Sequence, residues 1–268
     1  MLEMLLNPEK VESHPAQIFF LGVILAFSSF FITYVIEVPS PCKSGAGLLF
    51  ASFITIAATP IFMSLFKKEE IKAKCIKPSL KLEYFKEHEV IIKSFFYFFF
   101  GIAVATYLLN TFLPDEITSY VFYDQRYSIE KKVFVGRFVG DVFWDIFINN
   151  TIVLLLAFVL SLVFGAASVF VLAWNASVLG VFLSMIDKAY GLPPVISLPI
   201  SFLAILPYGF FEFLGYFIGA VAGGILSVGI VKEGLSCEFK DVCYDALVYL
   251  FFGFVCIFLG ALIESFFV

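Results

Sequence analysis

Long apolar stretches constrain the fold of this chain more than any other feature of its sequence. A helix that crosses a lipid bilayer needs about 20 mostly apolar residues. Five stretches reach this length, namely residues 17–37, 45–66, 89–113, 148–173 and 241–267. The first is too long and lies too late in the chain for a cleaved signal peptide. The sequence therefore predicts an all-α polytopic membrane protein, with residues 1–268 forming a single membrane domain.

The composition excludes most soluble classes of protein. Hydrophobic residues make up 61% of the chain and charged residues 15%, whereas soluble domains average about 45–50% and about 25%. A globule of this size has too little interior to bury that much apolar surface, so we expect the lipid bilayer to solvate much of it. The net charge of -5 offers no basic surface for a nucleic acid. A soluble enzyme, a nucleic-acid-binding domain and a disulfide-linked secreted domain are all disfavoured.

The number of spans depends on the region before the last helix. Residues 175–190 form a short apolar segment. Residues 195–231 are too long for one crossing, because as a helix they would extend roughly 55 Å against about 30 Å of hydrocarbon. Pro207 and Gly209 predict a break, with a half-length segment before it and a full helix after it. The sequence thus predicts six or seven transmembrane helices.

Lysine placement predicts the orientation of these spans. The loop of residues 67–88 is rich in lysine, and cytoplasmic loops carry an excess of Lys and Arg. Because two helices precede this loop, the N-terminus is also expected in the cytoplasm. The loop of residues 114–147 then lies outside, and seven spans would leave the C-terminus outside as well. We expect a multi-pass protein of the cell membrane.

The outer loop carries its own helical pattern. Four apolar residues recur at every fourth position, namely Phe134, Phe138, Val142 and Ile146. This spacing predicts an amphipathic helix near residues 133–147 that lies on the membrane surface and leads into the fourth span. The alternative is a plain extension of the fourth span beyond the bilayer.

One carboxylate stands out within the apolar segments. Glu212 follows the predicted break, and apolar residues flank it on both sides. An ionisable residue at membrane depth indicates a functional site, because burying an uncompensated charge costs several kcal/mol. The alternative is a helix-start carboxylate near the interface that only caps the helix.

Three asparagines are further polar candidates. Asn149 and Asn150 open the predicted fourth span, and Asn175 follows its far end. These side chains either cap helix ends or, as the alternative, one amide lies beside Glu212 in a shared polar cluster. Other charges sit at predicted helix ends and are expected at the membrane interface, namely Glu37, Lys93, Asp187 and Glu264.

Small residues predict close helix packing. Gly215, Gly219, Gly223 and Ser227 recur at every fourth position after Glu212. The fourth span has a matching face formed by Ala157, Ser161 and Gly165. Such stripes allow two helix backbones to approach closely. We expect these two helices to pack against each other.

Residues for catalysis or metal binding are scarce. His14 and His88 are the two histidines, and both lie in polar segments. The five cysteines contain no CxxC pair, and the chain has no HExxH and no phosphate-binding glycine loop. We expect no metal, no cofactor and no enzymatic activity.

A set of motifs resembles a known family. Asn149-Asn150 begins a small-residue helix that ends at Gly165, an aromatic-Asn turn follows at Trp174-Asn175, and the segment from Leu206 to Glu212 reads Leu-Pro-Tyr-Gly-x-x-Glu. In this order the motifs resemble the stage II sporulation protein M family of membrane proteins. Tyr208 stands where that family usually has histidine. The resemblance covers residues 143–231.

The resemblance implies a helical platform that binds other membrane proteins, since the sporulation member is a scaffold that gathers cell-wall hydrolases. Together with the small-residue faces, it predicts a scaffold or assembly protein whose partners are other membrane or envelope proteins or further copies of itself. The alternative is a transporter or channel subunit with its site at Glu212, because transporters often build a site from a broken helix beside a buried carboxylate.

Overall fold

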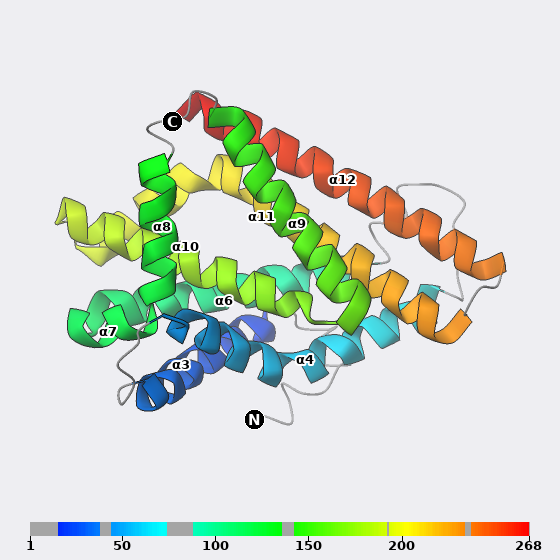
Figure 1. Ribbon diagram of the computed structural model, residues 1–268, viewed down its shortest axis with the longest axis horizontal. Helices are drawn as coiled ribbons and strands as arrows, with labels where there is room; N and C mark the ends of the chain where they lie inside the picture. Colours follow the sequence, from blue (N-terminus) through cyan, green and yellow to red (C-terminus); the bar gives the residue numbers. More distant parts are fainter. Residues whose placement is uncertain are drawn as a thin grey trace.

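The computed structural model describes residues 16–37, 44–73, 88–135, 142–191, 193–233 and 237–267. Over these residues the chain folds into helices and forms no strand (Figure 1). In chain order the helices are α3 (Gln17–Glu37), α4 (Ala46–Ala73), α6 (Glu89–Phe112), α7 (Asp115–Val121), α8 (Tyr123–Val135), α9 (Val142–Phe164), α10 (Ser168–Tyr190), α11 (Pro194–Glu233) and α12 (Cys237–Phe267).

Seven of these helices are long and apolar enough to cross a membrane. They are α3, α4, α6, α9, α10, α11 and α12. The shorter α7 and α8 connect α6 to the region before α9. The protein is therefore a polytopic helical membrane protein with seven candidate spans in the described part of the chain.

The fourth span ends earlier than the apolar stretch of residues 148–173 predicted, and close to Gly165, where the family motif placed the end of this helix. Helix α9 stops at Phe164 instead of residue 173, and Gly165 takes a left-handed conformation with a φ of 68°, which glycine adopts at little cost. A Cβ at Gly165 would also lie 2.3 Å from the sulfur of Met63. The apolar run continues across this turn, so hydropathy alone did not reveal it. The predicted short segment of residues 175–190 is the second part of the full-length helix α10.

The predicted break at Pro207-Gly209 is also wrong. Helix α11 runs from Pro194 to Glu233 with Pro199 and Pro207 inside it. Proline removes one hydrogen bond and bends a helix without always ending it, when packing on both sides holds the helix together. Figure 1 shows the axis of α11 changing direction between its yellow and orange parts.

The two remaining loop predictions fall largely on undescribed residues. Residues 136–141, in the predicted surface helix 133–147, and residues 74–87, in the lysine-rich loop, lie outside the described part of the chain. Helix α9 begins at Val142. Residues 142–147 are therefore a continuation of the fourth span, as in the alternative interpretation.

The helices pack in two connected groups. Helix α6 lies against α3 and α10, whereas α11 lies against α12 and α9 (Figure 1). Aromatic side chains fill the space where these groups meet. The ring of Phe99 on α6 lies 4.6 Å from that of Phe213 and 5.6 Å from that of Phe217, both on α11. These contacts join the two groups into one core.

Helix α8 is fastened to the bundle by three consecutive polar residues. Asp124 binds the start of α4, the Gln125 amide donates to Ser177 of α10 at 3.1 Å, and Arg126 donates to Asn110 of α6 at 2.8 Å. Successive side chains of a helix point about 100° apart, so these three reach three different neighbours. The polar residues therefore hold α8 between α4, α6 and α10.

The contact of Asp124 predicts a measurable effect on α4. Its carboxylate accepts hydrogen bonds from the backbone N–H groups of Gly45 and Gly47, each at 2.9 Å. These N–H groups have no partner within the helix. We expect Asp124→Ala to cost about 1–2 kcal/mol and to increase hydrogen exchange at the first turns of α4. Unchanged exchange there would show that water replaces the carboxylate without loss.

Candidate functional site

A buried polar cluster joins α9 to α11 at Glu212. The Asn150 amide nitrogen donates a hydrogen bond to a Glu212 carboxylate oxygen. The Tyr216 hydroxyl donates to the Asn150 amide oxygen at 2.8 Å. Asn150 is 5% exposed and Glu212 is 8% exposed. The cluster therefore lies inside the bundle.

The helices align these side chains by their spacing. Glu212 and Tyr216 are four residues apart on α11 and so lie on the same face. Asn150 lies inside α9, because that helix begins at Val142 and not at Asn149. Neither asparagine therefore caps a helix. Asn149 donates to the amide oxygen of Asn150 at 2.9 Å and supports the cluster from the same helix.

The hydrogen bonds of this cluster connect α9 to α11. An amide side chain donates and accepts, so Asn150 satisfies a carboxylate and a hydroxyl at once. A buried carboxylate needs such donors, because each polar group left unpaired costs about 1–3 kcal/mol. No group of three His, Cys, Asp or Glu side chains that could hold a metal ion occurs among the residues that the structure describes. The arrangement stabilises the contact of α9 with α11.

Two predicted members of the cluster have other surroundings. Asn175 lies inside α10 and donates to the carbonyl of Val171 at 2.8 Å, within its own helix. Tyr208, one turn before Glu212, lines a cavity between α10 and α11. Tyr216 was not predicted as a polar member, and its position four residues after Glu212 is the signal that could have indicated it.

The glycine stripe of α11 packs inside the protein. A Cβ at Gly219 or Gly223 would meet the carbonyl oxygens of Leu154 and Phe158 on α9 at 3.0 and 2.1 Å. Gly215 instead faces α12, where a Cβ would lie 3.1 Å from the carbonyl oxygen of Gly253. These short distances mean that backbones approach closely at all three glycines.

The matching face on α9 differs in one residue from the prediction. Ala157 and Ser161 are fully buried, and Ser161 lies beside Gly223 while donating to Ser168 at 2.7 Å. Gly165 lies beyond the end of α9 and forms the turn to α10. No contact of Ser227 with another helix is described. Gly215, Gly219 and Gly223 therefore serve contacts within this chain.

A second polar network, which the sequence did not indicate, lies where α6, α10 and α11 meet. Asp187 was expected at the interface, but it is 3% exposed. Its carboxylate accepts hydrogen bonds from the Tyr107 hydroxyl and, at 3.3 Å, from Ser201. Next to it, Ser184 accepts from Asn110 at 3.0 Å. Tertiary packing folds neighbouring helices over the end of α10, so this carboxylate is buried.

An exposed ion pair lies at the surface next to this network. Lys188 contacts Asp115 of α7 at 2.8 Å, and Arg126 lies 3.4 Å from the same carboxylate. The hydrogen bond from Lys188 lowers the pKa of Asp115 below its ordinary value. The pair fastens α7 to the end of α10, although exposed ion pairs of this kind contribute little stability.

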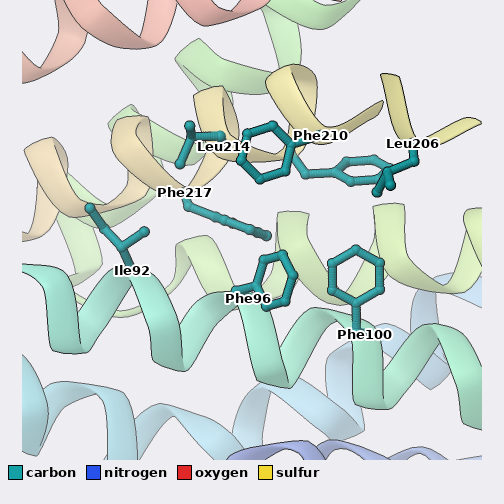
Figure 2. A pocket seen from close by; sticks show the side chains of 8 residues that line it. Ile92, Phe96, Phe100, Leu206, Phe210, Leu214 and Phe217 are labelled. Carbon is teal, nitrogen blue, oxygen red and sulfur yellow. The ribbon is translucent and has the colours of Figure 1, made fainter. Parts of the chain in front are cut away.

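The space between α6 and α11 is apolar. Figure 2 shows Ile92, Phe96 and Phe100 of α6 facing Leu206, Phe210, Leu214 and Phe217 of α11. The cavity among them has a volume of about 30 Å³, and an apolar cavity of this kind stays dry. Glu212, Asn150 and Tyr216 line neither this cavity nor the one at Tyr208.

His88 lies between α6 and α12, and its burial leads us to expect a pH dependence of the free energy of unfolding. It precedes the first residue of α6, and its ring lies 5.5 Å from that of Tyr249. Burial lowers the pKa of His88 from 6.5 to about 4. Unfolding therefore takes up a proton between these values, and the stabilisation present above pH 6.5 is lost as the pH falls toward 4.

We expect the wild type to lose about 2 kcal/mol from this residue between pH 7 and pH 5. His88→Phe keeps a ring at this position but does not titrate. Thermal unfolding at both pH values measures the difference between the two proteins. An equal pH dependence of both would contradict the buried state of His88.

The chain matches a known family of proteins. The family model of SpoIIM, Stage II sporulation protein M, matches residues 94–268, about two thirds of the chain. The match begins within α6 and covers α7 to α12, so it includes Asn150, Glu212 and Tyr216. No curated protein and no solved structure matches the chain.

Proposed function

The chain belongs to the stage II sporulation protein M family, and from this premise we propose that it is an integral membrane scaffold or assembly protein. The observation that carries this proposal is the packed state of Glu212. Its carboxylate is bound by Asn150 inside the bundle and lines neither described cavity. A carboxylate in this setting holds helices together, and a rigid bundle suits a protein that positions others.

The surface for partners lies away from the glycine stripe. We infer that partners bind at α7 and α8, on the side predicted to be outside the cell. On α8, Tyr123 is 40% exposed and Tyr127 is 58% exposed, and their spacing of four residues puts both rings on one face. Exposed tyrosines are common in protein interfaces, where they provide contact area at low entropic cost.

The attachment of α8 supports this assignment. Asp124, Gln125 and Arg126 lie between the two exposed tyrosines along the helix and bind three other helices. A docking surface held rigidly before binding loses little conformational entropy when a partner arrives. Helix α8 is therefore pre-organised for an envelope protein.

Site-specific crosslinking in native membranes tests the proposal. A photoreactive phenylalanine analogue at Tyr127 is expected to crosslink to one or a few defined proteins, which mass spectrometry identifies. The same analogue at Tyr244, an exposed tyrosine at the opposite end of the bundle on α12, serves as the matched control. The double variant Tyr123→Ala, Tyr127→Ala should lose co-purification of the identified protein while retaining the thermal stability of the wild type.

Two outcomes would contradict the scaffold proposal. One is the absence of any adduct at Tyr127 together with a monomeric protein in detergent. The other is ion or proton flux in reconstituted vesicles that Glu212→Gln abolishes, because a transporter needs this carboxylate to exchange with water. We expect no such flux, since the described surroundings of Glu212 are packed.

A further inference from the structure

A groove between α10 and the first part of α11 has the size of a ligand site. Its volume is about 450 Å³, within the range of about 300–1,000 Å³ for small-molecule pockets. Most of its walls are apolar or aromatic, formed by Phe182, Ile186, Tyr190, Ile200, Ala204, Ile205 and Tyr208. The lining also contains Asp187, Ser197 and Ser201, and the two tyrosines each carry a hydroxyl.

Asp187 offers acceptors only, and the hydroxyls of Ser197 and Ser201 have already used their donors. The Ser201 hydroxyl donates to Asp187 at 3.3 Å, and the Ser197 hydroxyl donates to the carbonyl of Pro193 at 3.1 Å. Asp187 is itself an acceptor, with the Tyr107 hydroxyl as its other donor. Each hydroxyl and the carboxylate keep free lone pairs. A ligand that satisfies Asp187 and the two serines must therefore donate hydrogen bonds.

The acidic side chain of the groove also has no basic partner within the described part of the chain. Asp187 forms no ion pair there, because Lys188 pairs with Asp115, and Arg126 contacts the same residue. A buried carboxylate with only hydroxyl partners favours a cation beside it. An anion such as a free phosphate is disfavoured for the same reason.

We propose that this groove binds a primary ammonium group carried on an apolar body. An ammonium has three N–H donors, which match the acceptors of Asp187, Ser197 and Ser201, and the apolar walls would cover the attached hydrocarbon. An aminophospholipid headgroup and a free alkylamine share this chemistry. The proposal does not depend on the scaffold function, because it uses none of the residues on the exposed face of α8.

Binding of alkylammonium compounds to the full chain tests the proposal. In nanodiscs of phosphatidylcholine, octylammonium is expected to bind saturably. It should bind about tenfold or more tightly than octyltrimethylammonium, which keeps the charge but has no N–H donor, and than octanol, which has no charge. Equal binding of the three compounds would overturn the proposal.

Two variants address the groove independently. Asp187→Asn keeps the shape of the side chain and should weaken octylammonium binding about tenfold or more. Ala204→Trp fills the groove and leaves the Asp187 side chain unchanged, and it should abolish binding even if the first variant folds poorly. Glu116→Gln, an exposed acid of α7 outside the groove, is the matched control. Binding unchanged in Ala204→Trp would overturn the proposal.

Native mass spectrometry then distinguishes the two sources of the ammonium. In nanodiscs with equal amounts of phosphatidylethanolamine and phosphatidylcholine, retention of the first lipid that Asp187→Asn removes would identify a lipid headgroup. Octylammonium binding without such retention would identify a free amine. Retention of both lipids in equal amounts, with no octylammonium binding, would overturn the proposal.

Discussion

Asn150→Leu is expected to lower the free energy of unfolding by about 2–4 kcal/mol, because two buried polar groups each lose a hydrogen-bond partner. The substitution takes away the donor to Glu212 and the acceptor for Tyr216 in one step. Leucine cannot replace either bond, and both groups stay inside the bundle. Unfolding of the purified protein in mild detergent, followed by circular dichroism, measures the loss.

Two other asparagines provide matched controls for this substitution. Asn149→Leu removes one partly buried donor to Asn150, and Asn175→Leu removes a bond within its own helix. We expect each to cost about 1 kcal/mol or less. Glu212→Gln should also be mild, because a Gln amide can pair with Asn150. Equal losses in all three asparagine variants would mean that the contact with Glu212 has no special energetic role.

Gly223→Ala is expected to destabilise the protein by about 3 kcal/mol, at the upper end of the usual cost of overpacking. Its new Cβ would lie 2.1 Å from the carbonyl oxygen of Phe158. That oxygen belongs to the backbone of α9, so no side-chain rotation can relieve the clash. The thermal midpoint in detergent should fall by about 6–12 °C on the scaling for soluble domains.

Gly209→Ala tests the same substitution in the same helix and should have the opposite effect. The atoms nearest its new Cβ belong to the side chains of Ile205 and Phe213, which can move. Alanine favours the helical conformation over glycine by about 1 kcal/mol, so this variant is expected to be as stable as the wild type or slightly more stable. A loss at Gly209 equal to that at Gly223 would contradict the close packing of α9 against α11.

Glu212 and Asp187 are both buried carboxylates, but their surroundings differ. The cluster at Asn150 joins α9 to α11, and the network at Asp187 joins α6, α10 and α11. The first is closed, whereas the second opens on a groove. This difference explains why we assign a structural role to Glu212 and a ligand to Asp187.

The membrane class and most of the spans could be predicted from the sequence. Hydropathy depends on local composition, and a helix in lipid must satisfy its backbone within its own segment. The bounds of α3 and α6 therefore agree closely with the apolar stretches of residues 17–37 and 89–113. The motifs from Asn149 to Glu212 likewise predicted the family to which the chain belongs.

Tertiary structure alone decided where the chain turns and which polar residues meet. The turn at Gly165 lies in an unbroken apolar run, so hydropathy does not mark it, whereas the left-handed conformation of this glycine does. Pro207 stays within α11 because neighbouring helices hold both sides of the bend. Asp187 is buried because α6 and α11 cover the end of α10. Sequence patterns report how each segment interacts with lipid, whereas these features depend on contacts between segments far apart in the chain.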